Sequence, residues 1–433
     1  MSKSRVVVNT ISQIASRVLV ILVSLITTSF LTRFFGAKGY GDYVFISSSI
    51  LVLLALTDLG TTTIAVRESS VEKEKAAKIF GNVLGLRLLL SLTLLVFFNL
   101  LVPFLPQFVG LRQAAFVASF VLPFLVLRTM SQAVLQTFLR LDIASLSEIL
   151  ASLLFLGFLI LFFLVGKTIS LTTLMLFWSI SALLSGIAGL FLSVKYLKIA
   201  PLFQKEETVK ILRDSLPLGI YLLVYSVYDR GIDSFIIKSF NSSTAVGYYG
   251  LAYKIHGNLI LGAAFLMNSL FPLISGFKND SSSLKLTFEK AFSVLLLSGI
   301  LILLGGFFLA PLVVRTIAGP DFDPSIIALR ILLGATLISY LNHLTGYLMV
   351  ALGEQKKLLL FSFVALFLNL ILNLIFIPKF SFFAAAWVTV LTEFSFFSFT
   401  QKHLAQKYSL KYSFSTLTEN VRMLFKKREK FFE

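Results

Sequence analysis

Long apolar runs constrain this sequence more than any other feature. A helix of about 20 mainly apolar residues spans the hydrocarbon core of a bilayer. Twelve such runs occur along the 433 residues, and most of them are separated by only a few residues. They cover residues 11–35, 43–66, 79–102, 113–137, 143–165, 171–196, 215–239, 244–271, 288–317, 324–350, 358–377 and 382–403. The sequence therefore predicts an all-α polytopic membrane protein with twelve transmembrane helices.

The composition supports lipid as the solvent for most of the chain. Hydrophobic residues make up 57% of it and charged residues 14%, whereas a soluble domain has about 25% charged residues. A soluble core could not bury so much apolar surface without leaving large exposed patches. The chain has no cysteine, which excludes disulfides, cysteine-ligated metals and thiol catalysis. Its three histidines are too widely spread to predict a metal site.

The basic residues predict the orientation, because Lys and Arg concentrate in cytoplasmic loops. With the N-terminus inside, the inside segments contain 25 basic residues and the outside segments contain 7. This asymmetry predicts that both termini are cytoplasmic. It also assigns most of the net charge of +17 to the cytoplasmic surface.

Similar motifs recur in the two halves of the chain. GYGDY at 39–43 resembles AVGYY at 245–249, and LRLD at 139–142 corresponds to ALGE at 351–354. Both halves begin inside and hold six spans, which predicts parallel repeats, a plan that places a transport site between two lobes. We predict an N-terminal lobe, a cytoplasmic linker, a C-terminal lobe and a basic amphipathic tail at 1–197, 198–213, 214–403 and 404–433.

Eleven charged residues fall inside the predicted spans. A charge in hydrocarbon costs at least about 3 kcal/mol, so these side chains should face the bundle interior or a wet cavity. The basic ones are Arg17, Arg87, Arg128, Arg230, Lys254 and Arg330. The acidic ones are Asp58, Glu148, Asp229, Asp233 and Glu393.

Several motifs, taken in order, resemble the Wzx-type polysaccharide flippases of the MATE-like multidrug/oligosaccharidyl-lipid/polysaccharide exporter (MOP) superfamily. The similarity runs from about residue 4 to about residue 403. The motifs are FFGAKGYGDY at 34–43, TDLG at 57–60, VRE at 66–68, VGYYGLAYK at 246–254, ALGEQK at 351–356 and NLILN at 369–373. One segment departs from the family pattern. Ser381 and Ala384 stand where the family often has glycines, which puts the local turn in question.

The resemblance implies a V-shaped bundle of two six-helix lobes in a bacterial or archaeal plasma membrane. It implies alternating access and a substrate of polyprenyl-diphosphate-linked oligosaccharide, moved from the inner to the outer leaflet. It implies no enzyme activity, and other polysaccharide-assembly membrane proteins would be further partners.

Arginine suits a diphosphate because its fork binds phosphate oxygens bidentately at any physiological pH. We hypothesise that Arg17, Arg87 and Arg128, on the cytoplasmic side of the first lobe, capture the diphosphate. The second group of substrate-binding candidates, Arg230, Lys254 and Arg330, would help to pass it outward. The structural alternative is that these cations join helices through ion pairs, Arg17 with Asp58 and Arg230 with Asp229 or Asp233.

The carboxylates are candidates for ion coupling or for ion pairing. Burial raises the pKa of a carboxyl group toward neutrality, so such groups can bind a proton or Na⁺. The candidates are Asp58, Asp229, Asp233 and Glu393. Ion pairing is the alternative for the three aspartates, whereas Glu393 has no basic neighbour in its own span. No cofactor is expected, and no motif for a nucleotide-driven motor is present.

The tail after residue 403 is basic. A capping-box pattern at 416–419 precedes apolar residues at helical spacing and a basic cluster at 426–430. This pattern predicts a helix lying on the anionic lipids of the inner leaflet. No nucleic-acid-binding module accompanies the charge, so nucleic acid is not an expected partner.

Two other functions fit parts of the sequence. A cation-coupled multidrug or organic-cation antiporter of the same superfamily should favour carboxylates and aromatic residues in its cavity, and six basic against five acidic intramembrane residues do not separate it from a flippase. A membrane glycosyltransferase, polymerase or ligase usually needs a sizeable loop with catalytic carboxylates. No connection here is long enough to hold one.

Overall fold

The computed structural model describes residues 3–166, 169–230, 232–277 and 280–412. Side chains are described from Ala15 onward, except at 217, 221, 225, 227–230 and 272. The predicted surface helix of the tail, around 416–430, lies outside the described residues.

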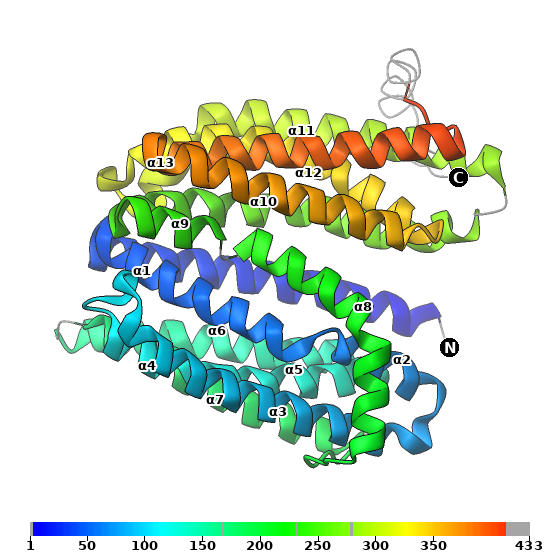
Figure 1. Ribbon diagram of the computed structural model, residues 1–433, viewed down its shortest axis with the longest axis horizontal. Coiled ribbons are helices and arrows are strands. Elements are labelled where there is room, and N and C mark those ends of the chain that lie inside the picture. Colours follow the sequence, from blue (N-terminus) through cyan, green and yellow to red (C-terminus); the bar gives the residue numbers. More distant parts are fainter. Residues whose placement is uncertain (1–2, 167–168, 231, 278–279, 413–433) are drawn as a thin grey trace. The chain divides into compact units, whose positions relative to one another are not determined.

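The described chain is helical (Figure 1). Nine of its helical stretches are long and apolar enough to cross a bilayer, which agrees with an all-α membrane protein. The α-helices are α1 (Lys3–Asp58), α2 (Thr61–Val71), α3 (Ala76–Leu101), α4 (Arg112–Ser119), α5 (Val121–Thr137), α6 (Leu141–Leu164), α7 (Leu171–Val194), α8 (Lys205–Arg230), α9 (Ile232–Phe240), α10 (Ser243–Gly276), α11 (Ser281–Ala318), α12 (Pro324–Ala351) and α13 (Gln355–Tyr408). Short 3₁₀ turns lie at Lys73–Lys75, Val102–Phe104, Pro106–Phe108 and Pro320–Phe322.

Helix α1 contains the first two predicted spans. Its 56 residues would make a straight rod of about 84 Å, far longer than a bilayer core of about 30 Å. The helix instead kinks at Gly36 (φ 62°, ψ −175°) and then doubles back (Figure 1). A residue with a side chain rarely takes this backbone conformation, so glycine allows the turn.

The predicted second span, 43–66, extends beyond the end of the helix that contains it. The structure ends α1 at Asp58 and begins α2 at Thr61. Between them Leu59 and Gly60 have positive φ angles of 44° and 76°, which a right-handed helix cannot contain. Gly60 also lies against Gly219 of α8, because a Cβ atom added at Gly60 would come within 2.8 Å of the Gly219 amide nitrogen. The apolar residues after the turn hid this break in the sequence.

Helix α13 contains the last two predicted spans in the same way. It has 54 residues and kinks at Ser381 (φ 54°, ψ −146°), three residues after Pro378. Ser381 is the position where the family pattern has glycine. The turn therefore forms without glycine, with serine in a backbone conformation that glycine favours.

The seventh predicted span, 215–239, is divided between two helices. Helix α8 ends at Arg230 and α9 begins at Ile232. Neither helix is among the nine candidate spans, and α9 has only nine residues, too few to cross a bilayer alone.

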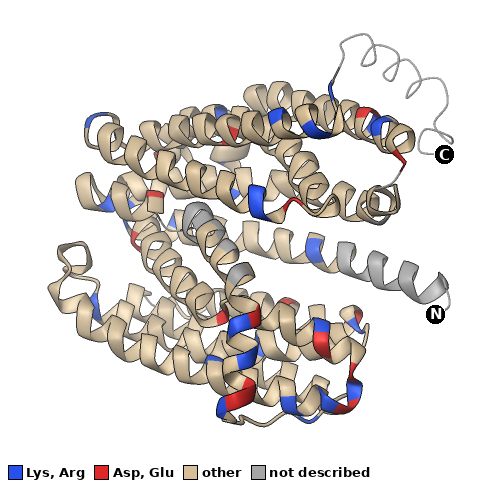
Figure 2. Cartoon of the chain, turned by 45° about the vertical axis from the view of Figure 1, so that its right-hand side comes forward, with Lys and Arg blue, Asp and Glu red and all other residues tan. Residues whose placement is uncertain are grey.

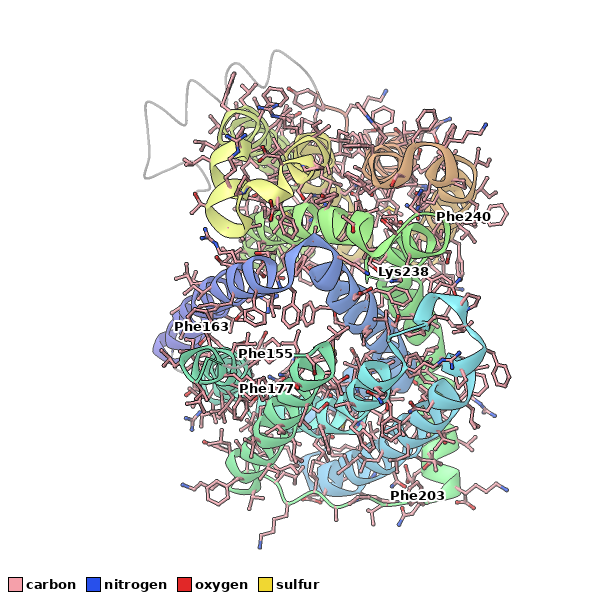
Figure 3. The ribbon with its side chains drawn as sticks, turned by 90° about the vertical axis from the view of Figure 1, so that its left-hand side faces the viewer. Phe155, Phe163, Phe177, Phe203, Lys238 and Phe240 are labelled. Carbon is pink, nitrogen blue, oxygen red and sulfur yellow. The ribbon has the colours of Figure 1, made fainter. Side chains whose placement is uncertain are left out.

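The chain divides into two compact units, unit 1 (Met1–Gly247) and unit 2 (Tyr248–Glu433). In unit 1, α2, α3, α5 and α8 share an apolar core that includes Ala65, Phe80, Met130 and Ile211. Aromatic rings join further helices. Phe155 of α6 stacks on Tyr43 of α1, with 6.5 Å between ring centroids, and Figure 3 shows Phe155 near Phe177 of α7.

In unit 2, α12 is the central helix. It packs against both α11 and α13. Its fully buried residues include Leu332, Leu344, Leu348 and Met349. Several polar residues of α12 are also buried, among them Ser339 and Asn342, which contact Glu393 of α13.

Candidate functional site

Most of the charges of unit 1 lie at one end of its helices. Figure 2 shows Lys, Arg, Asp and Glu gathered around α2 and the beginning of α8, whereas the middle of the bundle is almost free of them. The few charged side chains that do lie within the helical spans therefore identify candidate functional groups.

Arg17 forms an ion pair with Glu148, and Arg128 lies within electrostatic range of the same carboxylate. The Arg17 guanidinium on α1 donates to the Glu148 carboxylate on α6, with 3.0 Å between Nη1 and Oε1. The two side chains are 42% and 36% exposed, so the pair is open on one side. Glu148 is also the acidic group that interacts electrostatically with Arg128 of α5. The Nε atom of Arg128 is buried without a hydrogen-bond partner among the described residues.

Small side chains bring the three helices together at this cluster. Ser16 of α1 and Ser145 of α6 form a hydrogen bond of 2.9 Å between their hydroxyl oxygens, next to the ion pair. Gly186 of α7 lies so close to α5 that an added Cβ atom would be 2.9 Å from the Phe124 carbonyl oxygen and 3.7 Å from the Arg128 amide nitrogen. The backbone of α5 is thereby held in place beneath Arg128.

Arg87 has a different environment. Its side chain on α3 is only 3% exposed, and its Nη1 atom lies 3.5 Å from Asp58 Oδ1. The guanidinium also donates to the Thr62 hydroxyl. Asp58 in turn accepts from the amide and the hydroxyl of Thr62, at 3.0 and 2.7 Å. Arg87 and Asp58 therefore fasten the turn between α1 and α2 to α3.

These contacts give different environments to the three arginines that the sequence places in one group. Arg87 is matched by one carboxylate inside the protein, whereas Arg17 and Arg128 together face the single charge of Glu148. The Arg17–Arg128–Glu148 cluster therefore carries one surplus positive charge. Such a cluster can bind an anion, and guanidinium groups suit the oxygens of a phosphate.

Arg330 in unit 2 supports a helix backbone. Its Nε atom donates to the carbonyl oxygen of Phe307 on α11, at 3.1 Å, and its guanidinium lies 4.5 Å from the centroid of the Phe307 ring. In a regular helix this carbonyl would accept from the amide of residue 311. That residue is Pro311, which has no amide hydrogen. Arg330 thus supplies the donor that the proline lacks.

Glu393 of α13 is held by neutral groups of α12. One carboxylate oxygen accepts from the Ser339 hydroxyl and from the Asn342 amide, each at 2.8 Å. The Asn342 amide also donates to the backbone carbonyl of Glu393 at 2.9 Å. The Asn342 side-chain carbonyl is buried and has no hydrogen-bond partner among the described residues. Asn342 thus brings an acceptor without a donor next to the Glu393 carboxylate.

For the remaining candidates, the structure gives the helix on which each lies and, for two of them, the exposure of the side chain. Lys254 is exposed on α10, and Asp233 is buried on α9. Asp229 and Arg230 lie at the end of α8, and their side chains are outside those described.

Sequence reasoning missed two pairings. Arg17 pairs with Glu148 and not with Asp58, and 131 residues separate the two partners, so no helical spacing indicates the pair. Pro311 in the sequence could have indicated the role of Arg330. A proline inside a predicted membrane helix frees the carbonyl four residues before it, and a nearby donor should be sought.

The fold resembles solved transporters of one superfamily. A lipid II flippase MurJ in an inward closed conformation has a TM-score of 0.77 at 14% identity, over 97% of this chain and 92% of that one. An inward-facing MATE family multidrug resistance transporter has a TM-score of 0.70 at 16% identity, over 92% and 98%. A MOP superfamily transporter from Pyrococcus furiosus has a TM-score of 0.61 at 18% identity, over 93% and 95%.

Sequence comparison gives the family. An uncharacterized membrane protein of Methanocaldococcus jannaschii is 27% identical over 280 residues, which cover 62% of this chain and 65% of that protein, just under two thirds of its length. The profile of the polysaccharide biosynthesis protein family matches residues 6–278, more than half of the chain. With a MOP-superfamily fold and this match, the chain belongs to the polysaccharide biosynthesis protein family.

Proposed function

We propose that this protein is a flippase that moves polyprenyl-diphosphate-linked oligosaccharide units from the inner to the outer leaflet by alternating access. The family name and the shared fold with a lipid II flippase support transport of a lipid-linked saccharide. The observation that carries the proposal is the surplus positive charge of the Arg17–Arg128–Glu148 cluster inside membrane helices.

The proposed architecture has twelve spans in two lobes. The kinks at Gly36 and Ser381 divide α1 and α13 into two spans each, and α8 with α9 would supply the seventh. Together with the other long helices, these five spans give the twelve that the apolar runs predict. An even number of spans also agrees with cytoplasmic positions for both termini.

In the proposed mechanism, the diphosphate binds first. On the predicted topology, Arg17 and Arg128 lie toward the cytoplasmic side, where the head group enters. The diphosphate oxygens would accept hydrogen bonds from both guanidinium groups, while Glu148 keeps the pair from binding so tightly that release is blocked. The polyprenyl chain would stay in lipid while the glycan crosses through the protein.

Glu393 is our candidate for ion coupling. A carboxylate inside a membrane helix can exchange a proton or Na⁺, because burial favours its neutral or cation-bound form. We expect Glu393→Gln to remove any stimulation of flipping by a pH or Na⁺ gradient, while flipping without a gradient persists.

The proposed function is tested in proteoliposomes that contain a fluorescent lipid-linked oligosaccharide. The purified protein should make the inner-leaflet substrate accessible to an external glycan-modifying reagent, and empty liposomes should not. If accessibility is the same with and without the protein, the proposal is wrong.

The second candidate is a cation-coupled exporter of organic cations. Glu393 favours it, because a carboxylate in a membrane helix can hold a cationic substrate as well as a coupling ion. Gradient-driven efflux of a cationic dye from the same proteoliposomes, without flipping of the lipid-linked oligosaccharide, would favour this function.

A further inference from the structure

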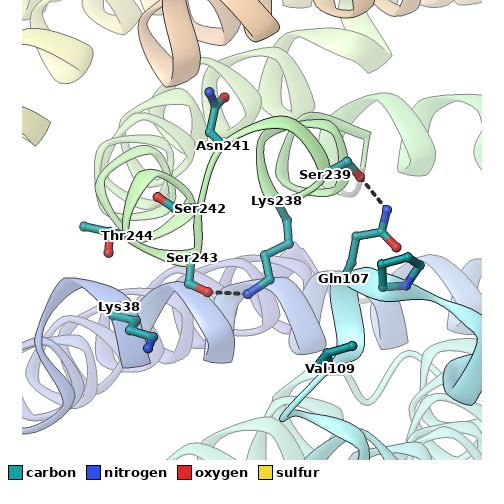
Figure 4. Close-up of a pocket in the computed structure, with 10 residues that line it drawn as sticks. Lys38, Gln107, Val109, Lys238, Ser239, Asn241, Ser242, Ser243 and Thr244 are labelled. Atoms are coloured by element: carbon teal, nitrogen blue, oxygen red, sulfur yellow. Dashed lines mark hydrogen bonds between the residues drawn. The ribbon is translucent and has the colours of Figure 1, made fainter.

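Unit 1 contains a polar pocket that the transport mechanism does not use. Its volume is about 360 Å³, within the range of small-ligand sites. It lies where the kink of α1, the loop between α3 and α4, and the connection from α9 to α10 meet (Figure 4). The lysine asymmetry predicts that this end of the unit faces outward. The polar residues around it include Lys38, Gln107, Lys238, Asn241, Ser242 and Thr244.

We propose that this pocket binds an anionic saccharide, a sugar that carries a carboxylate. The inference rests on the proposed function only for the origin of the sugar, which would be the glycan delivered to the outer leaflet. Three features of the pocket support it: a fixed lysine, a second lysine that adds charge, and a buried acceptor that needs a hydroxyl donor.

The first feature is Lys238, whose ammonium group is held in the pocket wall. It lies 2.7 Å from an Asp42 carboxylate oxygen, and both side chains are nearly buried. It also donates to the Ser243 hydroxyl (Figure 4) and lies 5.8 Å from the centroid of the Phe45 ring. Asp42 compensates this lysine, so Lys238 offers a positioned donor without net charge.

The second feature is the net positive charge of the pocket, which comes from Lys38. It is exposed beside the kink of α1 and lines the same pocket. Among the described residues, no ion pair involves Lys38, and no carboxylate lines the pocket. The pocket therefore has one net positive charge, which favours a ligand with one negative charge.

The third feature is the side-chain amide oxygen of Gln107, an acceptor that a hydroxyl group could satisfy. Its amide nitrogen donates to the Ser239 hydroxyl at 3.0 Å (Figure 4). Its amide oxygen is buried and has no hydrogen-bond partner among the described residues. A fully deprotonated anion such as sulfate has no hydrogen to donate to this oxygen, whereas a sugar hydroxyl has. An acceptor and a cation around one pocket thus match a sugar acid better than an anion without a hydroxyl group.

Binding can be measured without transport, so this inference and the proposed function fail separately. The full-length protein in phosphatidylcholine nanodiscs is titrated with glucuronate and with glucose by saturation-transfer-difference NMR. We expect glucuronate to bind and glucose to bind at least about tenfold more weakly, the effect of one charge-assisted contact. Sulfate, an anion without a hydroxyl group, should displace glucuronate poorly.

The variants test the named residues. We expect Lys38→Gln to weaken glucuronate binding about tenfold and Gln107→Leu about fivefold. Lys379→Gln, an exposed lysine beside the kink of α13, is the matched control and should leave binding unchanged. Because Lys38 is exposed, its substitution should not impair folding, and the thermal midpoint checks this.

Four results would overturn the inference. Glucose could bind as well as glucuronate, or the Lys38 and Gln107 variants could bind glucuronate like the wild type. Sulfate could displace glucuronate at equal concentration, which would make the pocket a plain anion site. Finally, glucuronate binding could disappear in nanodiscs with phosphatidylglycerol, which would assign the pocket to a lipid head group.

Discussion

At the scale of single residues, a charge inside a membrane helix can serve the backbone as well as a ligand. Arg330 illustrates the first use, because it donates to the Phe307 carbonyl that Pro311 leaves without an amide donor. Leaving a carbonyl unsatisfied away from water, here in a predicted membrane span, costs about 1–3 kcal/mol. The contact therefore explains why an arginine is kept between two apolar helices without any ligand.

This account of Arg330 predicts a specific coupling. Arg330→Met should lower the free energy of unfolding by about 1–3 kcal/mol. In a Pro311→Ala background, residue 311 regains an amide hydrogen, so the same substitution should cost about 1 kcal/mol less. Thermal unfolding in detergent of the four proteins of the cycle measures the difference. Equal costs in both backgrounds would show that Arg330 acts through another contact.

Glu148 gives the second prediction at this scale. It is the carboxylate that Arg17 and Arg128 share, so it competes with any bound phosphate for their guanidinium groups. Glu148→Gln should therefore raise the affinity for inorganic diphosphate about tenfold, an electrostatic effect near 1.4 kcal/mol. Isothermal titration calorimetry measures this affinity. Weaker binding in the variant would mean that Glu148 positions the arginines instead of competing for them.

At the scale of the helices, two kinks use similar backbone conformations with different residues. Gly36 and Ser381 have φ angles of 62° and 54°. Ser381→Gly should stabilise the protein by about 1 kcal/mol, because glycine adopts this conformation without strain. Gly36→Ala should destabilise it by about 1–2 kcal/mol. The cost would be conformational, since an added Cβ atom at Gly36 meets no atom within 4 Å.

Thermal midpoints of the two kink variants check this prediction. Gly110→Ala is a matched control for Gly36→Ala, because Gly110 also has a positive φ angle and open space around its Cβ direction, but lies in a loop. It should be destabilised to a similar extent. A Ser381→Gly variant less stable than the wild type would contradict the assignment of strain to Ser381.

The end of α13 is fastened to the turn before it by Glu354. This carboxylate accepts from Lys407 and, at 2.7 Å, from the Tyr408 hydroxyl, and it lies 3.1 Å from His403 Nε2. The hydrogen bonds from Lys407 and then Tyr408 lower the pKa of Glu354 from 4.5 to about 2. Because the folded-state pKa is depressed, the contribution to stability is complete above pH 4.5 and is lost as the pH falls toward 2.

Glu354→Gln should therefore reduce stability at neutral pH. The difference from the wild type should shrink as the pH falls from about 4.5 toward 2, because the carboxylate is protonated first in the unfolded state and only near pH 2 in the folded state. Thermal midpoints at neutral pH and at pH values below 4.5 measure it, with Glu74→Gln, an exposed carboxylate, as the control. A constant difference across this range would contradict the role of the charge.

The helices could be predicted from the sequence better than their contacts. Apolar runs of bilayer length locate α3, α6, α7 and α12 closely, because each needs one continuous apolar stretch. The break after Asp58 could not be seen, since the uncharged segment TTTIAV at 61–66 continues the run while the φ angles of Leu59 and Gly60 change sign. Hydropathy does not record backbone conformation.

The candidate site was predicted in its residue types and not in its partners. The cost of a charge in lipid singles out Arg17 and Arg128 from the sequence alone. Which carboxylate each one meets depends on how α1, α5 and α6 pack. That packing relies on small residues such as Ser16, Ser145 and Gly186, whose close contacts have no periodic signal.

At the scale of the whole molecule, our central claim is that the surplus charge of the Arg17–Arg128–Glu148 cluster captures the diphosphate of a lipid-linked oligosaccharide. Reversal of the charge at Arg128 would make the cluster negative and should repel the substrate. Arg67, which is exposed on α2 and 65% accessible, provides a control of the same residue type in the same unit.

The most direct test measures the flipping rate of a lipid-linked oligosaccharide in proteoliposomes with Arg128→Glu, Arg67→Gln and the wild-type protein. We expect Arg128→Glu to lower the rate at least about a hundredfold, the loss of two to three kcal/mol of substrate interaction. Arg67→Gln should flip at the wild-type rate. An Arg128→Glu protein that is folded and flips as fast as the wild type would contradict the claim.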